Sequence, residues 1–206
     1  MTSMLNAISS FFVYTFLAIG AQNVIFTRGL GLSNGLRMIS DPKKDTLYFC
    51  ISFAGFQLLN SILAYFILPI LYKTQLAPYA RFASPVVIVI CCAISFIVVV
   101  FALSMSVTTK MFKKLVLSLT SASINSAIVG TIILSTTRGF NLAETIGFAF
   151  GTSVGYFFAM LLISEGNRKI NHELVPEHFR GLPIMLIYIS VLALAIYGLT
   201  GHSLAL

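Results

Sequence analysis

Residues 82–109 read FASPVVIVICCAISFIVVVFALSMSVTT, a stretch without a single charged side chain. A helix of about 20 apolar residues is long enough to cross the hydrocarbon core of a bilayer. Because lipid offers the backbone no hydrogen-bond partners, a helix is the expected form of such a stretch. Five further charge-free runs of at least about 20 residues occur along the chain, at 1–27, 46–72, 115–137, 145–164 and 181–201. The sequence therefore predicts an all-α integral membrane protein with six transmembrane helices.

The composition agrees with a single membrane domain over residues 1–206. Only 9% of the residues are charged and 58% are hydrophobic, whereas a soluble domain carries about a quarter charged residues. We find no nucleophile–base pair, no phosphate-binding glycine loop and no paired acids within a span, so no catalytic residue is predicted. The cysteines, Cys50, Cys91 and Cys92, lie within apolar runs and form no C-x-x-C pair. We expect them to be small buried side chains, and we predict no metal site.

The net charge is +7. The distribution of the basic residues along the chain indicates how the protein is oriented in the membrane rather than a nucleic-acid partner. Most of the basic residues fall in the first, third and fifth loops. Loops rich in Lys and Arg stay on the cytoplasmic side of a membrane, so both termini are expected outside. These basic residues are Arg28, Arg37, Lys43, Lys44, Lys110, Lys113, Lys114, Arg168, Lys169 and Arg180.

Two of the six runs are interrupted. In the first, Gln22 and Asn23 precede the glycine-rich stretch RGLGLSNG at 28–35, and in the fourth, polar residues gather at 118–126 before Gly130. Each interrupted run opens one half of the chain, which predicts two inverted three-helix repeats, about 8–109 and 110–206, with helices one and four discontinuous at mid-membrane. The alternative is a first helix that ends at Arg28 and a fourth that carries ordinary packing hydroxyls.

Two other spans carry packing signals. Gly147, Gly151 and Gly155 repeat at four-residue spacing in the fifth run, which predicts a face where another helix approaches closely. Gln57 and Asn60 lie in the second run, where their amides are expected to bond to a neighbouring helix.

Four motifs resemble those of a known family. They are QNVIFTRGLGLS at 22–33, SINSAIVG at 123–130, Gly151-x-x-x-Gly155 followed by an aromatic, and VPEHFRGLPIMLI at 175–187 with LALAIYGLTG at 192–201. The chain is similar over nearly its whole length to the A subunits of Rnf electron-transport complexes and the E subunits of the sodium-pumping NADH:quinone reductase, Nqr. This resemblance implies a multi-pass protein of the bacterial plasma membrane. Its implied partners are a homologous membrane sister subunit, together with other redox-complex subunits.

The chain departs from the family at two positions. In the family, cysteines of the two broken helices hold an iron–sulfur cluster at the interface with the sister subunit, and here these positions are Ser33 and Ser126. A serine hydroxyl is hard and almost never ionised, so the resemblance implies that this chain alone binds no cofactor. An iron–sulfur cluster or flavin is expected in partner subunits.

The remaining site residues implied by the resemblance are Asn23, Gly31 and Asn125, together with Arg28. A base within the membrane is expected to face protein or water, and the alternative for Arg28 is an interfacial anchor.

The leading hypothesis is a subunit of an Rnf/Nqr-like complex that couples electron transfer to ion translocation, at most a non-catalytic subunit of a redox-driven translocase. Two alternatives stay open: a divergent paralogue that transports a cation or small solute, and a membrane scaffold or assembly protein. Iron or a redox cofactor in the purified material would separate the first from the second. Activity changes at Asn23, Ser33 or Ser126 without loss of expression would exclude the third.

Overall fold

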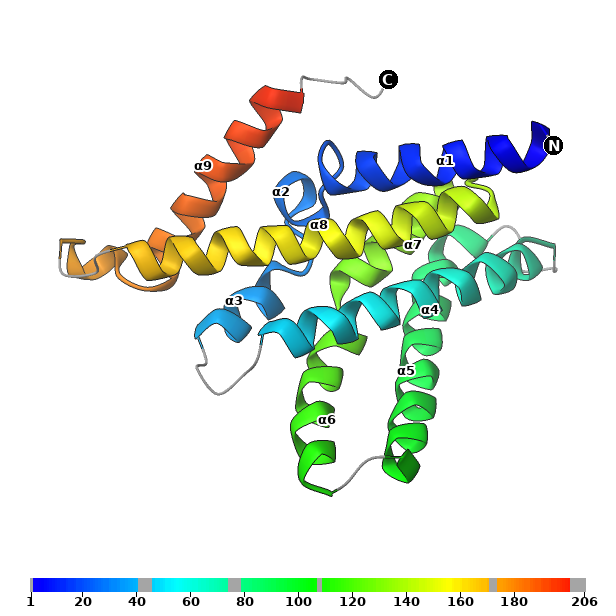
Figure 1. The fold of residues 1–206 in the computed structure, drawn as a ribbon, viewed down its shortest axis with the longest axis horizontal. Coiled ribbons are helices and arrows are strands. Elements are labelled where there is room, and N and C mark those ends of the chain that lie inside the picture. The colour runs from blue at the N-terminus through cyan, green and yellow to red at the C-terminus, as the bar shows by residue number, and fades with distance from the viewer. Residues whose placement is uncertain (1, 41–45, 74–78, 107–108, 171–173, 201–206) are drawn as a thin grey trace.

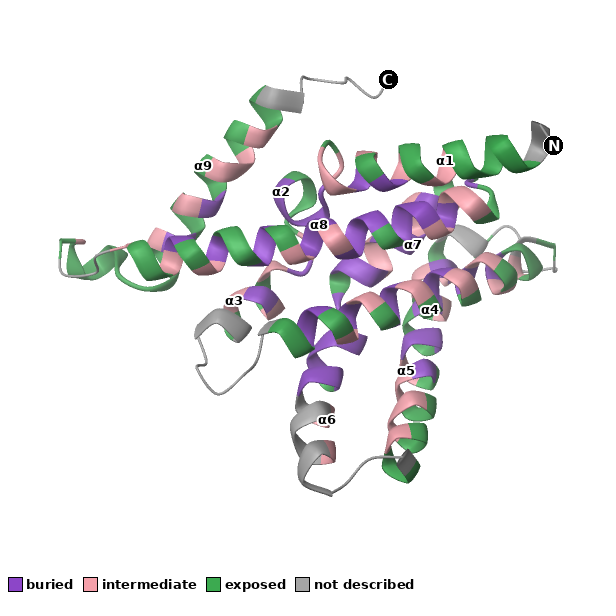
Figure 2. Ribbon diagram, viewed as in Figure 1, coloured by how far each residue is buried: buried purple, intermediate pink, exposed green. Residues whose placement is uncertain are grey.

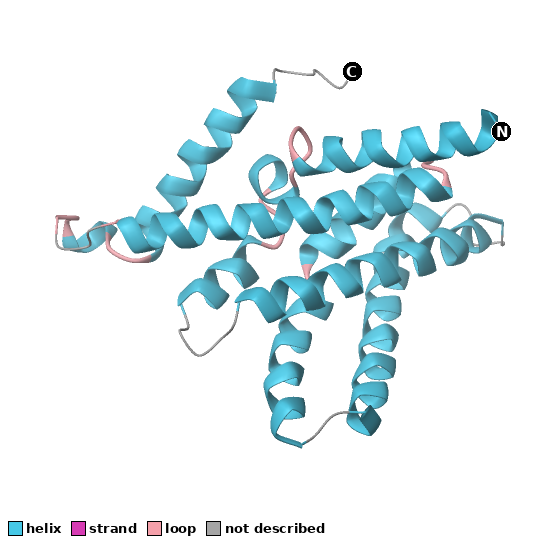
Figure 3. Cartoon of the chain, viewed as in Figure 1, coloured by secondary structure: helices cyan, strands magenta, loops and turns pink. Residues whose placement is uncertain are grey.

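The computed structural model describes residues 2–40, 46–73, 79–106, 109–170 and 174–200, and these are helical almost throughout (Figure 3). The helices in chain order are α1 (Thr2–Ile19), α2 (Val24–Arg28), α3 (Leu32–Ser40), α4 (Thr46–Lys73), α5 (Ala80–Ser106), α6 (Thr109–Ser123), α7 (Ser126–Thr137), α8 (Leu142–Lys169), the short 3-10 helix η2 (Glu177–Phe179) and α9 (Leu182–Thr200).

Four helical segments are long and apolar enough to cross a membrane: Leu47–Leu71, Phe82–Met105, Ser118–Thr137 and Leu142–Lys169. Two shorter apolar helices, Met4–Ile19 and Leu182–Gly198, occupy the first and sixth predicted runs. Exposed apolar side chains cover the outer faces of α1, α5 and α9 (Figure 2). Such a surface suits lipid contact, because hydrocarbon solvates apolar groups that water would expel.

Both interrupted runs are discontinuous helices. The first run breaks after Ile19 and again at Gly29–Gly31, where Gly29 has φ 65° and closes α2 by donating its N–H to carbonyls of that helix. The left-handed conformation costs glycine little because it has no Cβ. The fourth run breaks at Ile124 and Asn125, between α6 and α7. The alternative of one uninterrupted fourth helix is therefore wrong.

α8 is the central helix, with α1 on one side and α4 on the other (Figure 1). The predicted glycine face explains how α1 comes so close. A Cβ on Gly147 would lie 3.0 Å from the Cα of Phe11, and one on Gly151 would lie 2.8 Å from the Cα of Thr15. Thr15 uses this proximity, since its hydroxyl lies 3.0 Å from the Gly147 carbonyl oxygen and can donate to it.

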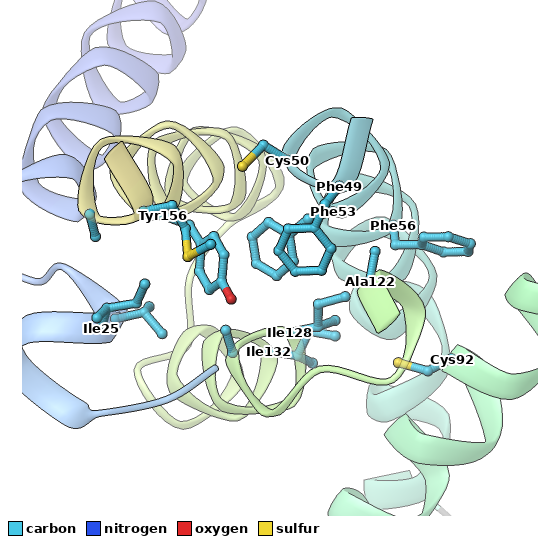
Figure 4. Close-up of a cluster of buried hydrophobic side chains, with 14 of the residues drawn as sticks. Ile25, Phe49, Cys50, Phe53, Phe56, Cys92, Ala122, Ile128, Ile132 and Tyr156 are labelled. Carbon is cyan, nitrogen blue, oxygen red and sulfur yellow. The ribbon is translucent and has the colours of Figure 1, made fainter. Parts of the chain in front are cut away.

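The main core lies between α4, α7 and α8. Phe53 stacks on Tyr156 with ring centroids 4.2 Å apart, and Phe49 lies beside the same ring (Figure 4). Ile128 and Ile132 from α7 close the cluster. This packing holds α7, the second half of a broken helix, against the two long helices.

The two amides predicted to bond across helices behave differently. Asn60 accepts a hydrogen bond from Ser95 on α5 at 3.1 Å, as predicted. Gln57 instead donates to Ser61 within α4, at 3.2 Å, so that prediction is wrong for Gln57.

Candidate functional site

Asn23 lies between α1 and α2, and its side chain hydrogen-bonds to backbone groups of α1, α2 and α8. Its Oδ1 accepts from the N–H groups of Ile25 at 3.1 Å and Phe26 at 3.4 Å, which caps α2. Its Nδ2 donates to the carbonyl oxygens of Ile19 at 3.1 Å and of Gly155 on α8 at 2.9 Å. The side chain is buried, and one amide therefore bonds to three backbone groups at the break and to one carbonyl oxygen of α8.

Asn125 has the matching position at the second break. Its Oδ1 accepts from the N–H of Ala127 at 3.0 Å and caps α7. Its Nδ2 donates to the hydroxyl oxygen of Tyr156 at 3.4 Å. Both breaks thus begin their second half-helix with a buried asparagine cap, and both caps bond to neighbouring residues of α8.

The second break of the first run, at Gly29–Gly31, meets the break of the fourth run at Gly31. Its N–H donates to the Ser126 hydroxyl at 2.9 Å, and its carbonyl oxygen accepts from the Tyr156 hydroxyl at 2.8 Å. Gly31 has φ 77°, and a Cβ there would lie 2.7 Å from both Asn125 Oδ1 and Tyr156 Cε2. Only glycine fits this position, for conformational and steric reasons together. We call Asn23, Gly31, Asn125, Ser126 and Tyr156 the crossing cluster.

α3 continues the contact between the halves. Asn34 donates to the carbonyl oxygens of Ser121 at 3.2 Å and Ile124 at 3.4 Å, and Arg37 donates to the Ser121 hydroxyl at 3.1 Å. The carbonyls that the break leaves at the end of α6 therefore gain partners from α3.

The structure brings together four of the six predicted site residues and leaves two outside. Gly31, Asn125 and the exposed Ser126 belong to the crossing cluster, and Asn23 joins it through Gly155, the neighbour of Tyr156, whereas Ser33 and Arg28 lie outside it and are also exposed. Ser33 lines a cavity of about 410 Å³ with Arg37, Asn167 and Met185. Arg28 is in the last turn of α2, where a cation interacts favourably with the helix dipole.

The donors in this region do not fit an iron–sulfur cluster. Thiolates hold iron because they are soft and anionic, whereas Ser33 and Ser126 offer neutral hydroxyl oxygens. The Ser126 oxygen is already a hydrogen-bond acceptor for Gly31. The three cysteines are buried on α4 and α5, and in the described part of the chain no three His, Cys, Asp or Glu side chains gather as a metal group.

Sequence reasoning missed Tyr156, Asn34 and Ser121 as members of this region. Tyr156 is the aromatic residue that follows Gly155 in the motif on the fifth run. The motif includes this residue but does not indicate that its hydroxyl bonds to both interrupted runs. Nothing in the pattern around Asn34 distinguishes it from a loop amide.

Comparison with known proteins finds one family that matches most of this chain. The family described as "Rnf-Nqr subunit, membrane protein" matches residues 11–203. The A subunit of an ion-translocating oxidoreductase complex from Syntrophotalea carbinolica is 36% identical over 77 residues, which are 37% of this chain and 40% of that protein. The corresponding protein from Buchnera aphidicola is 30% identical over 95 residues, 46% of this chain and 49% of that protein.

The E subunit of a Na(+)-translocating NADH-quinone reductase from Chlamydia trachomatis is 32% identical over 79 residues, 38% of this chain and 32% of that protein. The matched stretches thus span at most about half the length of these relatives. Several apolar helices and a family match over most of the chain make this a multi-pass membrane protein. The chain belongs to the family of Rnf-Nqr membrane subunits.

Proposed function

We propose that this chain is a non-catalytic membrane subunit of a multi-subunit complex that couples electron transfer to ion translocation. The single observation that carries the proposal is the family match over residues 11–203, whose relatives are named as subunits of ion-translocating oxidoreductases. The crossing cluster supports it, because the family's first-helix and fourth-helix motifs meet there in space.

The chain provides no cluster ligands of its own in this proposal. Ser126 takes a structural part, accepting the Gly31 N–H at the position where the resemblance implies a metal-binding thiolate in the family. Iron–sulfur or flavin groups of the complex belong to partner subunits. The expected neighbour is a homologous membrane protein of the same complex, seated on the exposed surface that carries Ser33, Ile124 and Ser126.

We also propose the six-span topology. In this arrangement α1–α3, α4 and α5 form the first repeat, about 8–109, and α6–α7, α8 and α9 form the second, about 110–206. Two features support it: each repeat opens with a helix broken before an asparagine cap, and α4 and α8 run in opposite directions (Figure 1). The breaks then lie at mid-membrane, with both termini outside the bacterial plasma membrane. A reporter fused after Leu206 tests this, and a cytoplasmic signal would contradict it.

Affinity purification of the tagged chain from its native membrane tests the function. We expect it to co-purify with redox subunits, and we expect the eluate to contain iron or flavin visible in the reduced-minus-oxidised spectrum. Denaturing separation should leave any covalently held flavin on other chains. A colourless, iron-free and partnerless protein would contradict the proposal and favour a transporter or scaffold.

A further inference from the structure

A cavity of about 160 Å³ lies where the second half of α4 packs against the end of α7 and the start of α8. It is separate from the crossing cluster and shares no residue with it. Hydroxyl groups come from all three helices, and the described lining residues include no charged side chain. The hydroxyl-bearing residues are Ser61, Tyr65, Ser135, Thr136 and Thr145.

Two of these hydroxyls have already used their protons. Ser135 donates to the Ile132 carbonyl oxygen at 2.9 Å, and Thr136 donates to the same oxygen at 2.7 Å. A hydroxyl has one proton and two lone pairs. Toward an occupant of the cavity, Ser135 and Thr136 therefore act only as acceptors.

Helix α4 adds further acceptors. Pro69 lines the cavity and has no N–H, so the carbonyl oxygen of Tyr65, four residues earlier, lacks its usual helical donor. One turn before Ser61, the buried amide of Gln57 donates to the Ser61 hydroxyl, and Gln57 Oε1 has no partner among the described atoms. Oxygen lone pairs are thus available in and beside this cavity, from Ser135, Thr136, the Tyr65 carbonyl and Gln57.

We propose that this cavity is a binding site for a small monovalent cation, such as Na⁺, held by neutral oxygens. Hard cations take hydroxyl and carbonyl oxygens as ligands, and lone pairs directed at the cavity suit a cation better than an anion. The volume admits an ion with a few waters.

A lysine in a neighbouring cavity disfavours divalent cations. A more open cavity of about 660 Å³ adjoins the first at Pro69 and Thr136 and includes Lys73. The ammonium group lowers the affinity for every cation and repels a divalent ion twice as strongly as a monovalent one. With no carboxylate among the described lining residues to offset this, Mg²⁺ and Ca²⁺ are disfavoured.

The inference deepens the proposed function, because it rests on that function for what the ion does, though not for whether the ion binds. In an ion-translocating complex this cavity would be one of the sites at which the transported ion binds to this chain.

Thermal unfolding of the purified full chain, in whatever complex it is isolated, tests binding directly. NaCl is titrated against choline chloride at constant ionic strength, with KCl and MgCl₂ in parallel. We expect a saturable rise of the unfolding midpoint with Na⁺ or K⁺ and none with choline or Mg²⁺, because a ligand that binds only the folded state stabilises it.

Variants locate the effect. Ser135→Ala and Thr136→Val should each weaken the apparent cation affinity about fivefold, the usual worth of one lost polar contact. Thr131→Val is the matched control, since Thr131 is buried on α7 and bonds to the Ala127 carbonyl in the same way, but lies outside the cavity. Pro69→Ala gives Tyr65 a helical donor, so it should weaken cation binding without lowering stability.

Two outcomes would overturn the site. One is an unfolding midpoint that is equal in Na⁺, K⁺ and choline, which would leave a water-filled cavity. The other is a cation effect that survives unchanged in all three cavity variants. These failures are distinct from failure of the proposed function: isolation without redox partners would remove that function and leave the titration readable. A cation-independent midpoint in a preparation with redox partners would remove the cavity site alone.

Discussion

The hydroxyl of Tyr156 on α8 donates to the carbonyl oxygen of Gly31 at 2.8 Å and accepts from the amide of Asn125 at 3.4 Å. One side chain therefore joins the Gly29–Gly31 break of the first run to the break of the fourth. Its ring is fixed independently of these bonds by stacking on Phe53.

Tyr156→Phe should lower the free energy of unfolding by about 1–3 kcal/mol, because the ring packing stays while a buried carbonyl and a buried amide lose their partner. Thermal or denaturant unfolding in detergent measures this. Tyr188→Phe is the control, since that hydroxyl donates to the Leu162 carbonyl at 3.3 Å in a more exposed place. Equal effects of the two substitutions would contradict a special role for Tyr156.

Asn23→Asp should be severely destabilising, by about 3 kcal/mol or more. The carboxylate could still cap α2, but it would face the carbonyl oxygens of Ile19 and Gly155 in a buried place with no proton to donate. Yield and unfolding midpoint are the measurements. Asn141→Asp is the matched control: Asn141 is an exposed cap of α8 whose side chain accepts from the Glu144 N–H, so a carboxylate suits it. Tolerance at both positions would contradict the bonding assigned to Asn23.

Gly31→Ala should cost clearly more stability than Gly29→Ala. Both glycines have positive φ, so each alanine bears the conformational cost of about 1–2 kcal/mol. A Cβ on Gly29 meets no atom within 4 Å, whereas one on Gly31 meets Asn125 and Tyr156 at 2.7 Å. The difference between the two unfolding free energies isolates the close approach of the breaks. If the two variants unfold alike, the breaks do not meet as described.

Much of this architecture follows from local signals. The charge-free runs predicted the long helices, three glycines between 28 and 35 predicted the interruption of the first run, and glycines at four-residue spacing predicted a close-packing face on α8, though not that α1 would be its partner. These signals suffice because each depends on the chemistry of neighbouring residues, such as the length of an apolar run or the absence of a Cβ.

The crossing cluster could be predicted only in part. Asn23 and Asn125 were predicted site residues, and they are helix caps, a local role that sequence can indicate. The partners of Gly31 could not be derived, because its bonds to Ser126 and Tyr156 join residues 95 and 125 positions apart. Ser33 and Ser126 were predicted together from the family motif, yet only Ser126 bonds to Gly31, and Ser33 lies in the first turn of α3.

The double substitution Ser33→Cys with Ser126→Cys tests whether the family's site geometry persists. In the native complex, with a cysteine-bearing sister chain present, we expect the variant to gain iron above the unsubstituted complex, because soft thiolates replace hard hydroxyls. Iron analysis and the optical spectrum of the intact complex measure this. Ser126→Cys alone should weaken the bond to the Gly31 N–H, because sulfur is a poor acceptor. The pair Ser118→Cys and Ser121→Cys on α6 is the control for adventitious iron. Equal iron in both double variants would show that the site has lost the spacing that a cluster needs.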